Sequence, residues 1–218
     1  MAQLSADAET VRRNLATTQR RIDEACARVE RAPGEVRVCV ATKYVDAAGM
    51  AALREAGVRI AAENRLQDMT AKQEQFGGDF EWHFIGSIQS RKIREIAERV
   101  TTIHSLASES ARDKLAGMER PPTLLVQVNV GEEESKSGIE PAALGEFLAG
   151  CPIAVSGLMT MPPLAATPED ARPYFRALAA LAAEHGLSEL SMGTTQDFEV
   201  AVEEGATLVR VGSAIFAA

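Results

Sequence analysis

One lysine stands out at the end of an apolar stretch near the start of the chain. In VRVCVATKYVD, residues 36–46, Val36, Val38 and Val40 indicate a buried strand, and Lys43 follows at its end. Such a lysine can extend its ammonium group into water along its aliphatic stem. Apolar walls instead favour the uncharged amine, which forms Schiff bases with carbonyl compounds. Lys43 is therefore either a solvent-exposed residue or a candidate for covalent binding of a carbonyl compound.

Two turns rich in small residues lie near the C-terminus. Gly193 and Thr195 occur in SMGTTQDF, and Gly212 and Ser213 occur in LVRVGSAIF, each after an apolar stretch. Backbone N–H groups that open a helix can bind an anion, and barrel proteins often bind phosphate after their seventh and eighth strands. Alternatively, the glycines only permit tight turns and Ser213 only caps a helix. Together with a strand-end lysine, the two turns favour a phosphate site.

Arg210 adds a third group to this set. A carbonyl-reactive lysine and phosphate-binding turns in one site predict pyridoxal 5'-phosphate as the cofactor. Arg210 precedes the turn at Gly212, where it could face the ring nitrogen of that cofactor. Because arginine stays protonated, the ring nitrogen would accept a hydrogen bond and remain unprotonated, which weakens the cofactor as an electron sink. The alternative is that Arg210 pairs with an acid or faces solvent.

The hydrophobic pattern predicts eight strands, nearly all followed by a helix. We expect strands at 36–42, 58–61, 82–86, 102–106, 123–130, 153–158, 188–191 and 207–211, with helices near 46–56, 64–75, 89–99, 108–118, 140–149, 168–185 and 195–204. Stretches such as TLLVQVNV are apolar without alternation, which is typical of parallel strands buried on both faces. The sequence thus predicts a single (β/α)8 TIM barrel over residues 1–218, with an extra N-terminal helix at about 6–31.

An open doubly wound sheet is the alternative architecture. Its first turn would normally carry the glycine pattern G-x-G-x-x-G, and TKYVDAAG, which follows the first strand here, lacks it. In a barrel, functional residues lie at the carboxyl ends of strands and in the loops just after them. The conspicuous polar residues of this sequence fall at such positions: Lys43, Asn64, His83, Asn129, Thr195, Arg210 and Ser213.

The composition argues against several classes of function. With a net charge of −8, the chain is not suited to non-specific binding of nucleic acid or of an anionic membrane. No apolar stretch is long enough to span a membrane, and MAQLSADAETVRRN lacks the apolar core of a secretory signal. Cys26, Cys39 and Cys151 are widely spaced and odd in number, which predicts reduced thiols in a cytoplasmic protein rather than disulfides or a metal site.

Several motifs together resemble a known family. They are ATKYVD, AENRLQD, EWHFIGSIQSRK, VNVGEEESKSG, GLMTM and LSMGTTQDFEVAVEEGATLVRVGSAIF, and they extend from about residue 36 to the C-terminus. In this combination the chain is similar to the pyridoxal phosphate homeostasis proteins of the YggS/PROSC type. The resemblance implies a barrel related to the N-terminal domain of alanine racemase, without the second domain of that enzyme.

The resemblance also implies roles for individual residues. Lys43 would form the Schiff base, Asn64 and His83 would lie near the cofactor ring, and Arg210 would approach the pyridine nitrogen. We predict the following cofactor-binding residues, with no catalytic residue and no metal ligand: Lys43, Asn64, His83, Met192, Gly193, Thr195, Arg210, Gly212 and Ser213. For His83, a hydrogen-bonded core histidine is the alternative. The sequence departs from the family pattern at Thr42, Ala62, Arg65 and Thr194, which leaves the surroundings of Asn64 open.

The resulting hypothesis is an intracellular carrier that buffers or delivers pyridoxal 5'-phosphate. Its partners would be the cofactor and possible apo-enzyme recipients, and we expect a monomer. A racemase-like enzyme on the same cofactor is the alternative, although the tyrosine base of such racemases belongs to the missing domain. A third candidate is an aldolase-type barrel that binds a sugar phosphate through Lys43. The functions of the segments 89–92 and EEESKSG, residues 132–138, stay open.

Overall fold

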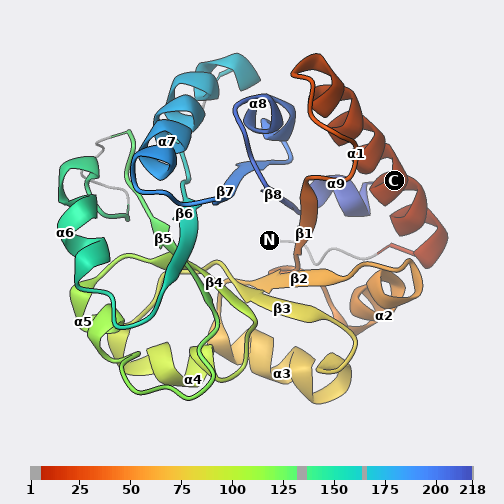
Figure 1. Ribbon diagram of the computed structural model, residues 1–218. Helices are drawn as coiled ribbons and strands as arrows, with labels where there is room; N and C mark the ends of the chain where they lie inside the picture. Colours follow the sequence, from red (N-terminus) through yellow and green to blue (C-terminus); the bar gives the residue numbers. More distant parts are fainter. Residues whose placement is uncertain (1–5, 132–136, 164–165, 218) are drawn as a thin grey trace.

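The computed structural model describes residues 6–131, 137–163 and 166–217, and it shows a closed barrel of parallel strands (Figure 1). The strands are β1 (Arg37–Ala41), β2 (Ile60–Glu63), β3 (Glu81–Phe84), β4 (Thr102–Leu106), β5 (Thr123–Gln127), β6 (Val155–Met159), β7 (Glu189–Thr194) and β8 (Leu208–Val211). Each strand pairs with the next, and β8 closes the barrel against β1, with Cys39 opposite Arg210. The predicted TIM barrel is therefore confirmed.

Helices surround the barrel in the predicted order. They are α2 (Ala47–Glu55), α3 (Leu66–Phe76), α4 (Ile93–Ala97), α5 (Glu109–Asp113), α6 (Leu144–Ala149), α7 (Arg172–Glu184) and α8 (Phe198–Glu203), with 3-10 turns before α4, α6 and α7 at Ser90–Lys92, Pro141–Ala143 and Pro168–Ala171. The segments 89–99 and 108–118 form shorter helices than the sequence pattern predicts. The EEESKSG loop lies mostly outside the described residues. No helix of the described part is long and apolar enough to cross a membrane.

The two sides of the sheet differ in character. Between the sheet and the helices lies the main hydrophobic core. Inside the barrel, the apolar cluster is small and consists of Cys39, Ile60, Ala62 and Leu208, with Ile85 packed against it. Polar side chains occupy much of the remaining interior, which is unusual because barrel interiors are commonly filled by branched apolar residues. This polar interior leads directly to the candidate site.

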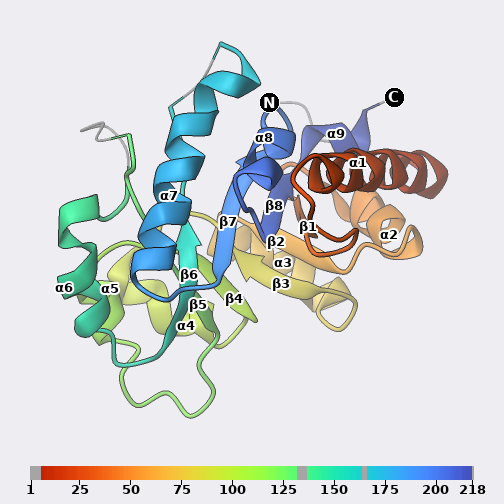
Figure 2. The ribbon, with the colours of Figure 1, turned by 45° about the horizontal axis from the view of Figure 1, so that its top comes forward.

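The N-terminal helix completes the outer ring. The last helix, α9 (Ser213–Phe216), is too short to cover β8 and β1, and α1 (Ala8–Arg28) lies across this part of the barrel beside α8, α9 and α2 (Figures 1 and 2). Its buried residues include Val11 and Ile22, and the Asn14 amide donates hydrogen bonds to two carbonyls at the end of the chain. The extra helix therefore takes the position of an eighth barrel helix.

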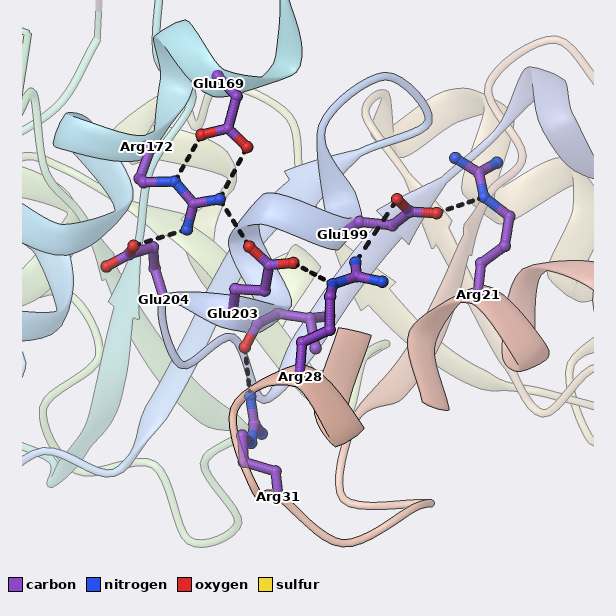
Figure 3. A network of polar contacts seen from close by, with 9 residues as sticks. Arg21, Arg28, Arg31, Glu169, Arg172, Glu199, Glu203 and Glu204 are labelled. Atoms are coloured by element: carbon purple, nitrogen blue, oxygen red, sulfur yellow. Dashed lines mark hydrogen bonds and ion pairs between the residues drawn. The ribbon is translucent and has the colours of Figure 1, made fainter. Parts of the chain in front are cut away.

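Ion pairs attach α1 to its neighbours and explain its many charges. Arg21 pairs with Glu199 at 2.6 Å, Arg28 pairs with Glu203 at 2.5 Å, and Arg172 of α7 also pairs with Glu203 at 2.6 Å (Figure 3). Exposed pairs of this kind contribute little singly, but shared carboxylates join them into a network. The network connects α1, α8 and α7 on the outside of the barrel.

Candidate functional site

A cavity of about 660 Å³ opens at the carboxyl ends of the strands, where barrel sites lie. Both small-residue turns, the strand-end lysine and the arginine of β8 contribute to its wall. The predicted site residues that line it are Lys43, Asn64, Thr195, Arg210, Gly212 and Ser213. Lys43 and Ser213, which are 170 positions apart in sequence, thus meet in one cavity because all eight strands end at the same rim.

Lys43 lies on the loop after β1, at the edge of this cavity. Thr42 is fully buried, and its N–H donates to the carbonyl of Ala62, so the chain leaves the barrel only after Thr42. The Lys43 side chain is exposed, with Nζ 5.1 Å from the centroid of the Tyr44 ring. It also borders a second cavity of about 410 Å³ beside α2 and α3. Of the two alternatives for Lys43, the structure shows an exposed side chain, which nevertheless lines the cavity.

An ion pair between Glu63 and Lys72, which no sequence motif indicates, supports the chain beneath Lys43. Glu63, at the end of β2, is completely buried and bonds to the ammonium group of Lys72 from α3. The Thr42 hydroxyl donates to Glu63 Oε1 at 2.7 Å, and Lys72 Nζ donates to the Thr42 carbonyl at 2.7 Å. The N–H of Asn64 donates to Glu63 Oε2 at 3.2 Å. One carboxylate therefore fixes the ends of both strands that present Lys43 and Asn64.

The turns after β7 and β8 contact one another. The N–H of Gly212 donates to the Thr195 hydroxyl at 3.3 Å. Asp197 accepts hydrogen bonds from the backbone N–H and the hydroxyl of Thr194, at 2.6 and 2.9 Å, and thereby shapes the first turn. Gly193 has φ of +90°, and a Cβ there would lie 2.6 Å from the Ala201 side chain. The turn consequently requires glycine, and its donors gather at one side of the cavity.

Arg210 forms the inner wall beside these turns. It is 5% exposed, and its Nη1 donates to the carbonyl and the hydroxyl of Ser191 at 2.7 and 2.6 Å. Its Nη2 donates to the carbonyl of Thr160 at 2.8 Å. Burial lowers the pKa of the guanidinium to about 10, which still leaves it charged at neutral pH. No carboxylate of the described residues forms an ion pair with Arg210.

Three predicted site residues lie outside the cavity wall. Met192 is fully buried in the core between sheet and helices, because it alternates with the inward-facing Ser191 along β7. Gly193 is buried behind the turn that it permits. His83 faces the barrel interior but lies two residues before Ile85, which lines the cavity, so it sits one layer deeper. Its role corresponds to the alternative of a hydrogen-bonded core histidine.

His83 belongs to a polar chain that crosses the barrel interior. Its Nδ1 lies 2.9 Å from Nε2 of His104, and Nδ1 of His104 lies 2.7 Å from the hydroxyl of Ser191, the same hydroxyl that Arg210 contacts. Burial lowers the pKa of His83 to about 4, with a further contribution from Arg37. Burial, then the nearby His83 and Arg210, lowers the pKa of His104 as well. Both imidazoles are therefore neutral at neutral pH.

An amine, a buried guanidinium and a group of hydroxyl and N–H donors thus converge on one cavity. The amine can attack a carbonyl carbon, and the donors at Thr195, Gly212 and Ser213 can bind an anionic group. The buried guanidinium can donate to a ligand because its Nε has no acceptor among the described residues. These groups fit a compact ligand that carries an aldehyde, an acceptor atom and a phosphate.

Comparisons with known proteins point to one family, although no family model matches the chain. The pyridoxal phosphate homeostasis protein of Aquifex aeolicus strain VF5 is 39% identical over 211 residues, which cover 90% of this chain and 92% of that protein. Among solved structures, PipY of Synechococcus elongatus PCC7942 with PLP bound matches with a TM-score of 0.75 and 31% identity, over 90% of this chain and all of that one.

A more distant structural match concerns the fold alone. Alanine racemase from Corynebacterium glutamicum matches with a TM-score of 0.72 at 17% identity, over 100% of this chain but only 64% of that enzyme. The barrel predicted from the alanine racemase resemblance is thus the shared part. The remaining third of that enzyme has no counterpart in this match.

Proposed function

This chain belongs to the pyridoxal phosphate homeostasis protein family, and from that premise we propose that it binds pyridoxal 5'-phosphate in the barrel-mouth cavity, as a Schiff base on Lys43. In this proposal the protein holds the cofactor reversibly and takes part in intracellular pyridoxal phosphate homeostasis. The observation that carries it is the convergence of Lys43, Arg210 and the two small-residue turns on one cavity. The cofactor supplies an electrophilic aldehyde, an aromatic ring with one basic nitrogen, and a phosphate.

Each group of the cavity has a matching task. Lys43 supplies the amine, and Arg210 donates to the ring nitrogen through a charge that is always present. The phosphate would be bound by Thr195, Ser213 and the backbone around Gly212. Asn64 also lines the cavity, and Glu63 fixes its backbone. We do not assign cofactor contacts to His83, Met192 or Gly193, because none of them reaches the cavity.

Among the described residues of the cavity wall, none is placed as the second base that a racemase-like enzyme requires. Such an enzyme needs one group that removes the α-proton on one face of its substrate and another that returns a proton on the opposite face. Tyr44 lines the cavity, but it follows Lys43 directly and its ring lies beside the Lys43 ammonium group, 5.1 Å away, so both come from the same side. A carrier is therefore favoured over a racemase. The three unpaired cysteines suit a reducing compartment, and we propose that the carrier acts in the cytoplasm, where apo-enzymes could receive the cofactor.

Covalent labelling tests the site. The purified protein is loaded with pyridoxal 5'-phosphate, reduced with borohydride, digested and mapped by mass spectrometry. We expect a pyridoxyl adduct on the peptide that contains Lys43. Lys43→Ala should lose the adduct and the associated absorbance band, yet keep weaker binding through the phosphate. Lys114→Ala, an exposed lysine outside the cavity, is the matched control. An adduct confined to another lysine would refute the assignment.

Proton exchange tests the choice between carrier and enzyme. The loaded protein is incubated with L-alanine and other L-amino acids in deuterated water, and the α-proton signal is followed by NMR. We expect no exchange beyond that of free pyridoxal 5'-phosphate at the same concentration. Turnover of about 1 s⁻¹ or more, lost in Lys43→Ala, would identify the protein as an enzyme instead.

A further inference from the structure

Four polar side chains from four strands form a continuous chain through the barrel interior. It runs from His83 on β3 through His104 on β4 and Ser191 on β7 to Arg210 on β8, with successive contacts of 2.9, 2.7 and 2.6 Å. All four are buried, and none of the four is more than 5% exposed. Only Arg210 reaches the cavity. The other three are polar groups in the barrel interior that the proposed binding of the cofactor does not yet use.

The hydrogen bonds that link these four side chains all run in one direction, from Arg210 to His83. Arg210 can only donate, so the Ser191 oxygen accepts from Nη1. The Ser191 hydroxyl proton then needs an acceptor, and within the described residues the one in reach is Nδ1 of His104. His104 must therefore carry its proton on Nε2 and donate it to Nδ1 of His83. The opposite tautomers would bury the Ser191 hydroxyl without an acceptor, which is unfavourable.

The chain orients Arg210 without neutralising it. Nη1 is bound by Ser191, and Nη2 by the carbonyl of Thr160 and the sulfur of Met161, all of them neutral acceptors. The two histidines are neutral as well. An aspartate or glutamate at the position of Ser191 would hold the guanidinium equally well but would cancel its charge. With neutral partners, the full positive charge and the Nε donor stay available at the cavity wall.

We propose that Ser191, His104 and His83 are positioning residues for Arg210, and that they form a neutral chain which fixes the orientation of its guanidinium toward the ring nitrogen of the bound cofactor. The inference rests on the proposed function for the identity of the ligand. The hydrogen bonds among the four side chains, in contrast, are present in the ligand-free protein. None of the three contacts the cavity, so they act through Arg210 alone. Loosening the chain would let the guanidinium move and would let the ring nitrogen bind a proton instead.

Nitrogen-15 NMR of histidine side chains tests the chain in the ligand-free protein. We expect both His83 and His104 to be neutral Nε2–H tautomers at pH 7, with Nδ1 signals typical of a hydrogen-bond acceptor. Ser191→Ala should shift the Nδ1 signal of His104, while Ser105→Ala should not. Ser105 is a matched control because its hydroxyl is equally buried on β4 but donates to Gly86. A protonated Nδ1 on His104 would overturn the proposed direction, whatever the protein binds.

Binding of pyridoxal 5'-phosphate labelled with nitrogen-15 in the ring tests the link to Arg210. Ser191→Ala should weaken binding about tenfold, a typical effect of one hydrogen bond to a charged group. It should also make the ring-nitrogen signal titrate with pH near neutrality, as it does not in the wild type. His104→Leu should act in the same direction, and His104→Asn, which keeps an acceptor for the Ser191 hydroxyl, should act less.

The two proposals fail in different ways. If the wild-type protein does not bind pyridoxal 5'-phosphate, the proposed function fails, while the histidine tautomers still decide whether the chain exists. If the wild type binds but Ser191→Ala and His104→Leu give the same ring-nitrogen signal and affinity as Ser105→Ala, the positioning role is refuted and the proposed function is untouched. A loss of affinity without any change in the ring-nitrogen signal would indicate a merely structural role and would also refute it.

Discussion

Two cations near the carboxyl ends of the strands, one partly and one fully buried, are held in opposite ways. Lys72, whose side chain is 14% exposed, pairs with the fully buried Glu63. Arg210, at 5% exposure, is held within the described residues by neutral acceptors, from Ser191, Thr160 and the sulfur of Met161. A buried charge is costly unless it is paired, so the unpaired one indicates where a ligand supplies the missing partner. Lys72 thus stabilises the strand ends, whereas Arg210 keeps its charge for the cavity.

Breaking the ion pair between Glu63 and Lys72 should give the largest loss of stability. Glu63→Gln leaves the Lys72 ammonium group without its carboxylate, and we expect the free energy of unfolding to fall by about 3–5 kcal/mol. The double variant Glu63→Gln, Lys72→Met should recover much of this loss, because it removes the unpaired charge. Urea unfolding at pH 7 measures both. A loss below about 1 kcal/mol in the single variant would show that Lys72 simply turns to solvent, and the contrast with Arg210 would disappear.

Removing the charge of Arg210 should affect cofactor binding more than it affects stability. Arg210→Met loses several hydrogen bonds but also relieves the cost of burying a charge, so we expect the unfolding free energy to change by only about 1 kcal/mol. Affinity for pyridoxal 5'-phosphate should fall about 10- to 100-fold, since a charge-assisted hydrogen bond contributes about 1.5–3 kcal/mol. Fluorescence titration measures the affinity. A destabilisation as large as that of Glu63→Gln would make Arg210 a structural residue like Lys72.

Lowering the pH should test whether the histidines that are linked to Arg210 are neutral in the folded protein. The pKa of His83 lies at about 4 in the folded protein because of burial and Arg37, against about 6.5 when unfolded. The unfolded state therefore binds the proton first, and stability is lost as pH falls from about 6.5 to 4. Between pH 7 and pH 5 this amounts to about 2 kcal/mol for His83.

The variant His83→Leu separates this contribution from other titrations. Between pH 7 and pH 5, its free energy of unfolding should fall by about 2 kcal/mol less than that of the wild type, as measured by urea unfolding at the two pH values. An unchanged pH dependence would mean that His83 accepts a proton in the folded barrel. The chain to Arg210 would then carry charge, and the contrast with the Glu63–Lys72 pair would be weaker.

Cations on the outside of the barrel provide the lower end of the comparison. Arg172 contacts Glu169, Glu203 and Glu204 in the outer network, while Arg20 has a single exposed partner (Figure 3 shows the network around Arg172). We expect Arg172→Ala to cost about 1 kcal/mol and Arg20→Ala less than about 0.5 kcal/mol of unfolding free energy, both reduced by added salt. Thermal unfolding at low and high salt measures the difference. Equal effects would show that sharing carboxylates adds nothing here.

Part of the site could be predicted because it depends on short stretches. Lys43 and the turns at Thr195 and Gly212 each come directly after an apolar strand. Because the strands end at the barrel mouth, this local position is enough to place all three there. Met192 packs in the core outside the barrel interior, because the two-residue alternation that turns Ser191 inward turns Met192 outward. His83 faces inward as required but lies one layer too deep, a depth that depends on the register with β2 and β4.

The amino-acid sequence by itself determined the eight strands, the closed barrel and the residues that end its strands, since hydrophobic periodicity and turn residues act locally. Only the tertiary structure decided that Glu63 meets Lys72, that Lys43 stands exposed above the rim, and that His83, His104 and Ser191 join Arg210. These contacts join strands and helices whose side chains meet only when the barrel closes. The register and tilt of the strands, which no short stretch encodes, therefore set the charge balance of the site.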